Sequence, residues 1–408
     1  MSEPAAPAPD WTRGGVSILA GRTGDALLRL GLFAATARVL TPAQFSVYAL
    51  VTAALGTLQN LLAFGGPRTA AYFQTRAPRS AVAGWLLGVA GTASLALLGV
   101  LALVPPARVA LFPEISARLL LLGLLPLPCL LLSDSFSAIL LAERRERLYS
   151  RFLWLRSAAT GAVLAGSLLV SDRLEWLLVG RLAISVLIVL ALVRALEMRP
   201  SVRGLRGFAP AAARFALPLA GSGAIGSTHR RADVFLLSAF EQTSQIGPYA
   251  VAYAFGEAFW TITDSLEAAL FVDLARHADE RARREAFRAA RVYAAISVAA
   301  LALGLPGGLL VIRWFFSARY PAAASLFPWI FVAAVFSGIG RPFSAYLVSR
   351  GEGPRVLLCG MLSTAVNLTL CILWIPAGGA LGAARATLVS YVLGTLLTCS
   401  LVLRRRPR

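Results

Sequence analysis

Apolar residues along this 408-residue chain gather into long stretches separated by short polar segments. Each stretch has about 20 largely apolar residues, the length that an α-helix needs to cross the hydrocarbon core of a bilayer. Lipid offers the backbone no hydrogen-bond partners, so we expect every stretch to be helical. The pattern predicts an all-α membrane protein of about twelve spans, at 15–38, 43–65, 81–105, 117–141, 152–171, 175–196, 213–240, 246–272, 291–314, 323–349, 354–376 and 380–403.

The composition agrees with this fold class. Apolar residues make up 58% of the chain and charged residues 14%, and the mean hydropathy is +0.71, values typical of multi-pass membrane proteins. The four cysteines fall in apolar stretches and the two histidines are far apart, so we expect no metal site. The longest loop, 273–290, is too short for a soluble catalytic domain. We therefore expect no enzyme and no catalytic residues.

The net charge of +19 comes mostly from arginines on one predicted side of the membrane. If the N-terminus is cytoplasmic, this asymmetry follows the positive-inside rule, and we expect both termini in the cytoplasm of a bacterium. Nucleic-acid binders instead carry clustered arginines with aromatics on soluble folds, so we expect no nucleic-acid partner. The predicted external loops hold only Arg38, Arg108, Arg118, Arg173 and Arg319.

Charged residues interrupt the first apolar stretch. Arg22, Asp25 and Arg29 lie at i, i+3 and i+7, so in a helix they share one face. An arginine or aspartate at the bilayer centre costs about 2.5–3.5 kcal/mol on insertion scales, so this face should line a cavity rather than contact lipid. The same charges disfavour a secretory signal, although Ala35-Thr36-Ala37 resembles a cleavage site.

The two halves of the chain resemble each other. A shift of 201 residues aligns Arg29 with Arg230 and Tyr48 with Tyr249, at equivalent places in each half. Parallel repeats of this kind are common in transporters. We predict a disordered tail (1–12), a six-helix lobe (13–196), a cytoplasmic linker (197–212), a second six-helix lobe (213–403) and a basic tail (404–408).

The seventh and eighth predicted spans carry a second set of charges. Two interpretations stay open: the residues pair with each other between helices, or they line a hydrated cavity. An arginine-lined cavity favours phosphate or pyrophosphate, which guanidinium binds bidentately. Its carboxylates could pair with the arginines, or could bind a coupling proton or Na⁺. The set comprises Arg230, Arg231, Asp233, Glu257, Asp264 and Glu267, with further cations at Arg156, Arg181, Arg341 and Arg385 in other spans.

Three segments give the chain a family resemblance. Residues 38–49 (RVLTPAQFSVYA) are similar to the turn after the first span of bacterial polysaccharide and O-antigen repeat-unit flippases, although Ser46 replaces the usual glycine. Residues 231–237 with 246–252 resemble the matching turn of the second half. Residues 366–387 resemble the family's last two spans, except that Arg385 stands where an apolar residue is usual. That arginine could alter the cavity or pair with a lipid phosphate.

The resemblance implies two six-helix lobes in a V around a cationic cavity with alternating access. It implies transport of undecaprenyl-pyrophosphate-linked oligosaccharide from the inner to the outer leaflet of the cytoplasmic membrane. On this basis Arg22, Arg29, Arg230 and Arg231 bind the pyrophosphate and sugar, and the coupling or ion-pair carboxylates are Asp25, Asp233, Glu257 and Asp264. No cofactor is expected, and a polymerase or chain-length partner stays open.

Two other functions remain as alternatives. A cation-coupled multidrug exporter of the same superfamily should have an acidic, aromatic cavity with few arginines. A membrane-embedded polysaccharide polymerase or ligase should have a sizeable external loop, whereas the predicted external loops are short and hold no histidine.

Overall fold

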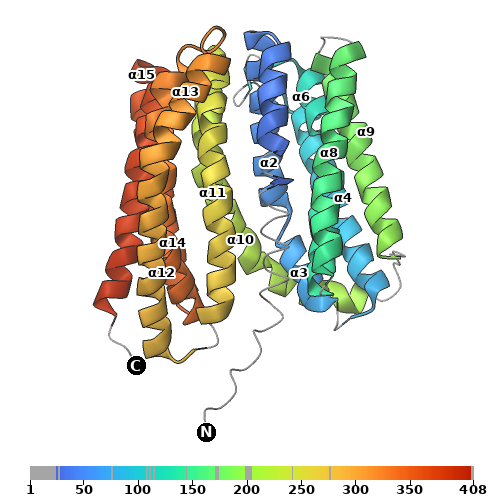
Figure 1. Ribbon diagram of the computed structural model, residues 1–408. Coiled ribbons are helices and arrows are strands. Elements are labelled where there is room, and N and C mark those ends of the chain that lie inside the picture. Colours follow the sequence, from blue (N-terminus) through green and yellow to red (C-terminus); the bar gives the residue numbers. More distant parts are fainter. Residues whose placement is uncertain are drawn as a thin grey trace.

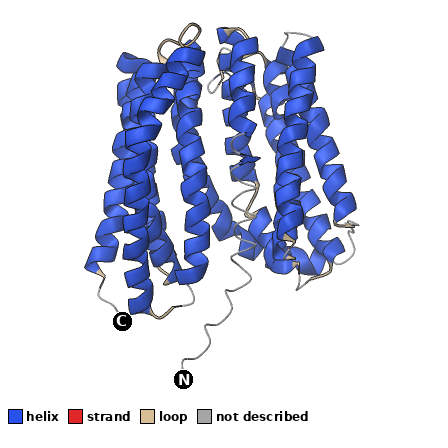
Figure 2. Cartoon of the chain, in the orientation of Figure 1, coloured by secondary structure: helices blue, strands red, loops and turns tan. Residues whose placement is uncertain are grey.

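The computed structural model describes residues 24–25, 28–74, 77–106, 109, 112–113, 115–143, 145–170, 174–197, 205–240, 242–274 and 277–405. Within these ranges the chain is helical and contains no strand (Figure 2). The predicted all-α class is confirmed. The predicted disordered tail and Arg22 lie outside the described residues.

Helices of the first half follow the predicted spans closely. Residues 28–39 are helical and belong to the first span. A glycine turn after α2 starts the short α3, with Gly65 at a left-handed φ of 64°. The further helices are α2 (Pro42–Leu62), α3 (Gly66–Phe73), α4 (Arg79–Leu103), α6 (Ala117–Leu124), α7 (Leu127–Ala142), α8 (Glu146–Val170) and α9 (Leu174–Ala195).

Helices of the second half are longer. In the described part of the chain, seven helices or joined helices are long and apolar enough to cross a membrane. The count of twelve spans therefore stays a prediction. The helices are α10 (Leu205–Ala239), the 3₁₀ turn η1 (Thr243–Gln245), α11 (Ile246–Leu274), α12 (Asp279–Ala299), the π-helical turn η2 (Ala300–Gly304), α13 (Leu305–Phe315), α14 (Ala323–Ser349) and α15 (Gly353–Arg404).

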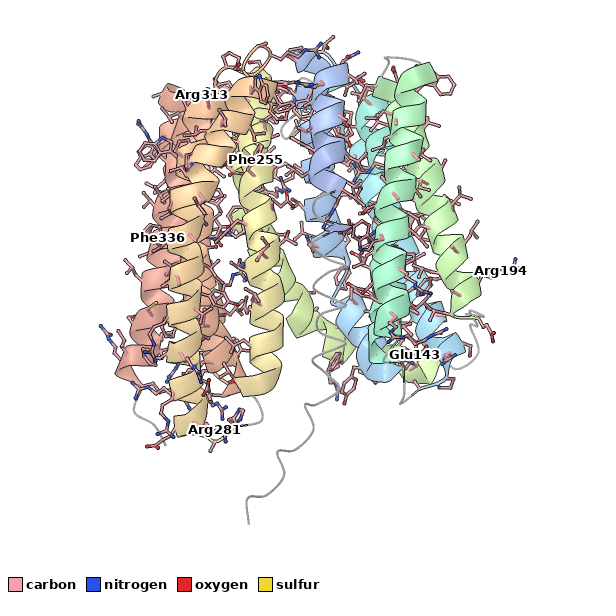
Figure 3. All side chains as sticks on the ribbon, viewed as in Figure 1. Glu143, Arg194, Phe255, Arg281, Arg313 and Phe336 are labelled. Atoms are coloured by element: carbon pink, nitrogen blue, oxygen red, sulfur yellow. The ribbon has the colours of Figure 1, made fainter. Side chains whose placement is uncertain are left out.

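The helices form two groups that stand side by side (Figure 1). Helices α2 to α9 lie on the right of the view and α11 to α15 on the left, while α10 begins beneath the first group and crosses to the second. Helix α2 packs against α10 and α11, so it joins the two groups. Arg281 lies at the lower end of the molecule and Arg313 at the upper end (Figure 3).

Helix α2 begins at a capping box. The Thr41 hydroxyl accepts a hydrogen bond from the Gln44 amide at 3.3 Å, and the Gln44 side chain accepts one from the Thr41 amide at 3.0 Å. Pro42 occupies the first helical position, where its missing N–H costs nothing. These residues fix where α2 starts, at the upper end of the molecule.

The same turn carries the contact between the two halves. The Gly247 amide donates to the Ser46 hydroxyl at 3.1 Å, and these residues are 201 positions apart, which is the shift that relates the repeats. Beside it, the Tyr320 hydroxyl donates to the Ala37 carbonyl at 3.0 Å and its ring lies 5.2 Å from that of Phe45. Burial raises the pKa of Tyr320 to about 12, so the phenol remains a donor at neutral pH. Equivalent parts of the repeats therefore meet at the upper end.

Helix α15 holds both of the last two predicted spans and is broken between them. Gly379 has φ 55° and ψ −139°, a conformation that only glycine adopts readily. The Gln245 side chain accepts a hydrogen bond from the Ala380 amide at 2.7 Å, which satisfies a group that the break leaves free. The kink thus turns the chain back into a hairpin.

We expect Gly379→Ala to lower the free energy of unfolding by about 1–3 kcal/mol, because alanine is strained at this φ and ψ. An added Cβ would also lie 2.2 Å from the Gln245 side-chain oxygen. Thermal unfolding in detergent measures the change. Gly378→Ala is the matched control, since a Cβ there meets no atom within 4 Å. Equal unfolding temperatures for the two variants would contradict the strain argument.

Candidate functional site

A cavity of about 440 Å³ lies between the two halves. Its walls come from the first helix, α2, α7, α8 and α9 on one side and from α10 and α11 on the other. Four arginines and two carboxylates are the charged residues that the described chain places on these walls: Arg29, Arg156, Arg181, Arg231, Asp134 and Glu257. The wall therefore carries an excess of positive charge inside the membrane-spanning part.

Asp25 organises the first-half side of this cavity. Its carboxylate lies 2.7 Å from the Arg29 guanidinium and 3.8 Å from that of Arg156, and it accepts a hydrogen bond from the Ser157 hydroxyl. The Asp25 side chain is 4% exposed, whereas that of Arg29 is 57% exposed. Asp25 thus lies behind the wall and holds Arg29 with one face open to the cavity.

A second group extends this wall through α7, α8 and α9. The Asp134 carboxylate lies 3.6 Å from Arg156 and accepts a hydrogen bond of 2.5 Å from the Gln59 amide. On α9, Arg181 donates to the Thr52 hydroxyl at 3.1 Å. Arg156 therefore bridges two carboxylates, while Arg181 has a neutral partner.

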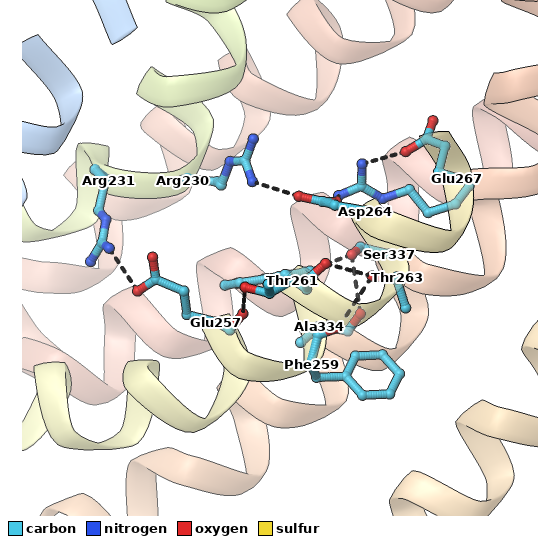
Figure 4. A network of polar contacts seen from close by, with 12 residues as sticks. Arg230, Arg231, Glu257, Phe259, Thr261, Thr263, Asp264, Glu267, Ala334 and Ser337 are labelled. Atoms are coloured by element: carbon cyan, nitrogen blue, oxygen red, sulfur yellow. Dashed lines mark hydrogen bonds and ion pairs between the residues drawn. The ribbon is translucent and has the colours of Figure 1, made fainter. Parts of the chain in front are cut away.

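Arg231 and Glu257 form the second-half wall of the cavity. Their side chains approach to 2.9 Å (Figure 4). The Arg231 guanidinium also lies over the Tyr253 ring at 4.4 Å from its centre. The aromatic face stabilises the cation, since the ring quadrupole is negative above the plane. Arg231 is consequently fixed on a rigid surface opposite the first half.

Arg230 pairs with a different carboxylate from its neighbour Arg231. It lies 3.3 Å from Asp264, and Arg341 of α14 lies 2.5 Å from Asp264 and 2.7 Å from Glu267 (Figure 4). Neither Arg230 nor Asp264 belongs to the cavity wall as the structure describes it. This group ties α10, α11 and α14 together beside the cavity.

Asp233 differs from the other predicted carboxylates. It is 1% exposed and accepts hydrogen bonds from the Tyr249 hydroxyl, the Thr387 hydroxyl at 3.2 Å and the Val234 amide at 2.8 Å. The described residues include no arginine in an ion pair with it. Of the four predicted carboxylates, Asp25, Glu257 and Asp264 are thus ion-paired and Asp233 is hydrogen-bonded.

Several residues of the cavity wall were not identified from the sequence. Asp134, Gln59 and Thr52 were not singled out, although a lone carboxylate inside an apolar span is by itself a sign of function. Arg385, the departure from the family pattern, lies 5.0 Å above the Trp329 ring and is exposed away from the cavity. Its role in the cavity is therefore not supported by the geometry.

Comparison with known proteins places the chain by sequence and by fold. The family model described as "Polysaccharide biosynthesis protein" matches residues 11–265. No curated protein matches the chain. The lipid II flippase MurJ in an inward closed conformation has a similar fold, with a TM-score of 0.75 and 15% identity over 96% of this chain and 87% of that one.

Multidrug transporters have a similar fold as well. An inward-facing MATE transporter of the MOP superfamily gives a TM-score of 0.70 at 13% identity, over 95% of this chain and 98% of that one. A eukaryotic MATE transporter, AtDTX14, gives 0.71 at 12% identity, over 96% and 94%. These likenesses support the predicted helical membrane fold.

We expect Asp25 and Arg156 to be energetically coupled. A double-mutant cycle of Asp25→Asn and Arg156→Gln should give a coupling energy of about 0.5–2 kcal/mol, since each single variant removes one charge of a pair that is 3.8 Å apart. Unfolding in detergent of the two single variants and the double variant measures it. Arg313→Gln, an exposed site at the upper end, combined with Asp25→Asn serves as the control and should be additive. Additivity of both pairs would exclude the interaction.

Proposed function

We propose that this chain, which belongs to the polysaccharide biosynthesis protein family, flips an undecaprenyl-pyrophosphate-linked oligosaccharide across the bacterial inner membrane. The substrate would pass from the cytoplasmic to the outer leaflet. The family and the fold shared with flippases and multidrug transporters support transport rather than catalysis.

The observation that carries this proposal is the arginine-lined cavity between the halves. Guanidinium groups bind phosphate oxygens bidentately and keep their charge in a low-dielectric setting. The described wall carries four arginines and two carboxylates, and this excess of positive charge suits an anionic head group. The same balance disfavours a cationic drug, which was the alternative substrate class.

Arg29 and Arg231 are the residues best placed to hold the pyrophosphate. They stand on opposite halves of the same cavity, so an anion between them would contact both. Arg230 pairs with Asp264 and does not belong to the described cavity wall, and Arg22 is not among the described residues. The polyprenyl tail would stay in lipid while the sugar occupies the cavity.

A coupling ion would act at Asp233. A buried carboxylate with hydrogen-bond donors but no arginine can accept a proton or Na⁺ without breaking an ion pair. Asp25, Glu257 and Asp264 would act as partners of the arginines instead.

Alternating access requires that one end of the cavity close when the other opens. We take the upper end as the external one, because the arginine-rich start of α12, marked by Arg281, lies at the lower end (Figure 3). The contacts of Ser46 with Gly247 and of Tyr320 with Ala37 then close the outer side. Release of substrate outward would require these contacts to separate.

Cells that lack this gene should accumulate the lipid-linked oligosaccharide in the inner leaflet of the cytoplasmic membrane. Wild-type protein should restore export, and Arg29→Ala or Arg231→Ala should lower the export rate about tenfold or more, because each removes a charge-assisted contact to the pyrophosphate. Leaflet-specific labelling of the sugar measures the result. Arg313→Ala, inserted at the same level, should export normally. Outer-leaflet accumulation in the deleted cells would refute the proposal.

A disulfide between positions 46 and 247 should lock the outer side closed. An added Cβ at Gly247 would lie 2.8 Å from the Ser46 side-chain oxygen, so cysteines at both positions would be close enough to react with each other. In a background with Cys129, Cys359, Cys371 and Cys399 replaced by alanine, oxidation should stop transport and dithiothreitol should restore it. Each single cysteine variant should be insensitive to oxidation. Normal transport by the oxidised double variant would show that this contact does not need to open.

A further inference from the structure

Arg181 differs from the other cavity arginines because the described part of the chain supplies no carboxylate partner for it. Arg29, Arg156 and Arg231 each lie within 4.0 Å of a carboxylate oxygen. Arg181 instead donates to the Thr52 hydroxyl, and the described part of the chain places no carboxylate within that distance of its guanidinium. A guanidinium inside a membrane span is costly unless something pairs with it. The missing counter-charge is therefore expected on a ligand.

The surroundings of Arg181 are suited to a sugar. Thr52 and Ser185 line the cavity on the neighbouring turns of α2 and α9, and the Ser185 hydroxyl donates to the Arg181 carbonyl at 2.7 Å. Ser133 of α7 also lines the cavity and is 1% exposed, and the described residues offer its hydroxyl no hydrogen-bond partner. A buried hydroxyl without a partner is destabilising by itself, and a bound hydroxyl or carboxylate would satisfy it.

Arg181 comes from a different helix than the arginines to which the pyrophosphate is assigned. It belongs to α9 of the first group of helices, whereas Arg231 belongs to α10. Both residues nevertheless face one cavity. A pyrophosphate held by Arg29 and Arg231 would leave the attached glycan to extend toward α9.

We propose that Arg181, with Thr52 and Ser133, forms a second subsite that binds a carboxylate on the glycan, such as that of a hexuronic acid. The inference rests on the proposed function, because it assumes that the cavity holds a lipid-linked oligosaccharide. It adds that this transporter selects an acidic oligosaccharide. One uncompensated guanidinium matches one singly charged group, and the hydroxyls around it match the sugar oxygens.

Vesicles containing the purified full-length protein test this selection. The probes are two polyprenyl-diphosphate disaccharides that differ only in the terminal sugar, a hexose in one and the corresponding hexuronic acid in the other. Wild-type protein should flip the acidic probe faster. Arg181→Gln, which keeps a donor but removes the charge, should slow the acidic probe about tenfold and change the neutral probe less than about twofold.

Three further variants separate the explanations. Thr52→Val keeps the side-chain shape but removes the hydroxyl that holds the guanidinium, and it should also reduce the preference for the acidic probe. Arg181→Lys keeps the charge and should retain part of the preference. Arg194→Gln, an exposed arginine at the end of the same helix, should leave both rates unchanged.

The results distinguish the subsite from the function on which it rests. Equal losses on both probes in Arg181→Gln would assign Arg181 to the pyrophosphate and overturn the proposal. Undiminished flipping of the acidic probe by Arg181→Gln would overturn it as well. If wild-type protein flips both probes equally, the subsite fails while the flippase function stands. If it flips neither, the proposed function itself fails.

Discussion

A charged side chain inside a membrane must find a partner on another helix, and this requirement organises the interior of this protein. Asp25 of the first span holds Arg156 of α8, Arg231 of α10 holds Glu257 of α11, and Arg341 of α14 holds two carboxylates of α11. Each pair links different helices, so it fixes how those helices are rotated about their axes. Some residues of this network, among them Arg156, Arg231 and Glu257, also line the cavity.

The helices could be predicted from the sequence because length and hydrophobicity determine a membrane span locally. The same argument separated the spans 354–376 and 380–403, and the break within α15 at Gly379 lies between them. Its cause could not be predicted, because the distant Gln245 satisfies the backbone that the break leaves free. The repeat was visible as a shift of 201 residues, and the structure brings Ser46 and Gly247, one such pair, into contact. The hydrophobic pattern thus predicts the helices, whereas their arrangement depends on packing between residues that are distant in the sequence.

The repeat was less informative about the site. Arg29 and Arg230 are equivalent by the shift, but Arg29 lines the cavity and Arg230 pairs with Asp264 outside the described wall. The reason is visible in the residues that surround them. The first-half counterparts of Asp264 and Arg341 are Ala63 and Leu140, so only the second half has the group that draws Arg230 away. The wall positions of Asp134 and Arg181 depend on how α7 and α9 pack, which no single-helix pattern reveals.

All cationic residues on the described cavity wall are arginines, and arginine keeps its charge across the physiological pH range. An anion bound by them cannot be released by deprotonation of its host, as it could be from lysine or histidine. If the cavity binds an anion as we propose, release can come from competition, in which a neighbouring carboxylate takes back the guanidinium. Asp25 and Glu257, each within 3 Å of a cavity arginine, would then compete with the substrate, and the empty transporter would be the ion-paired state to which each cycle returns.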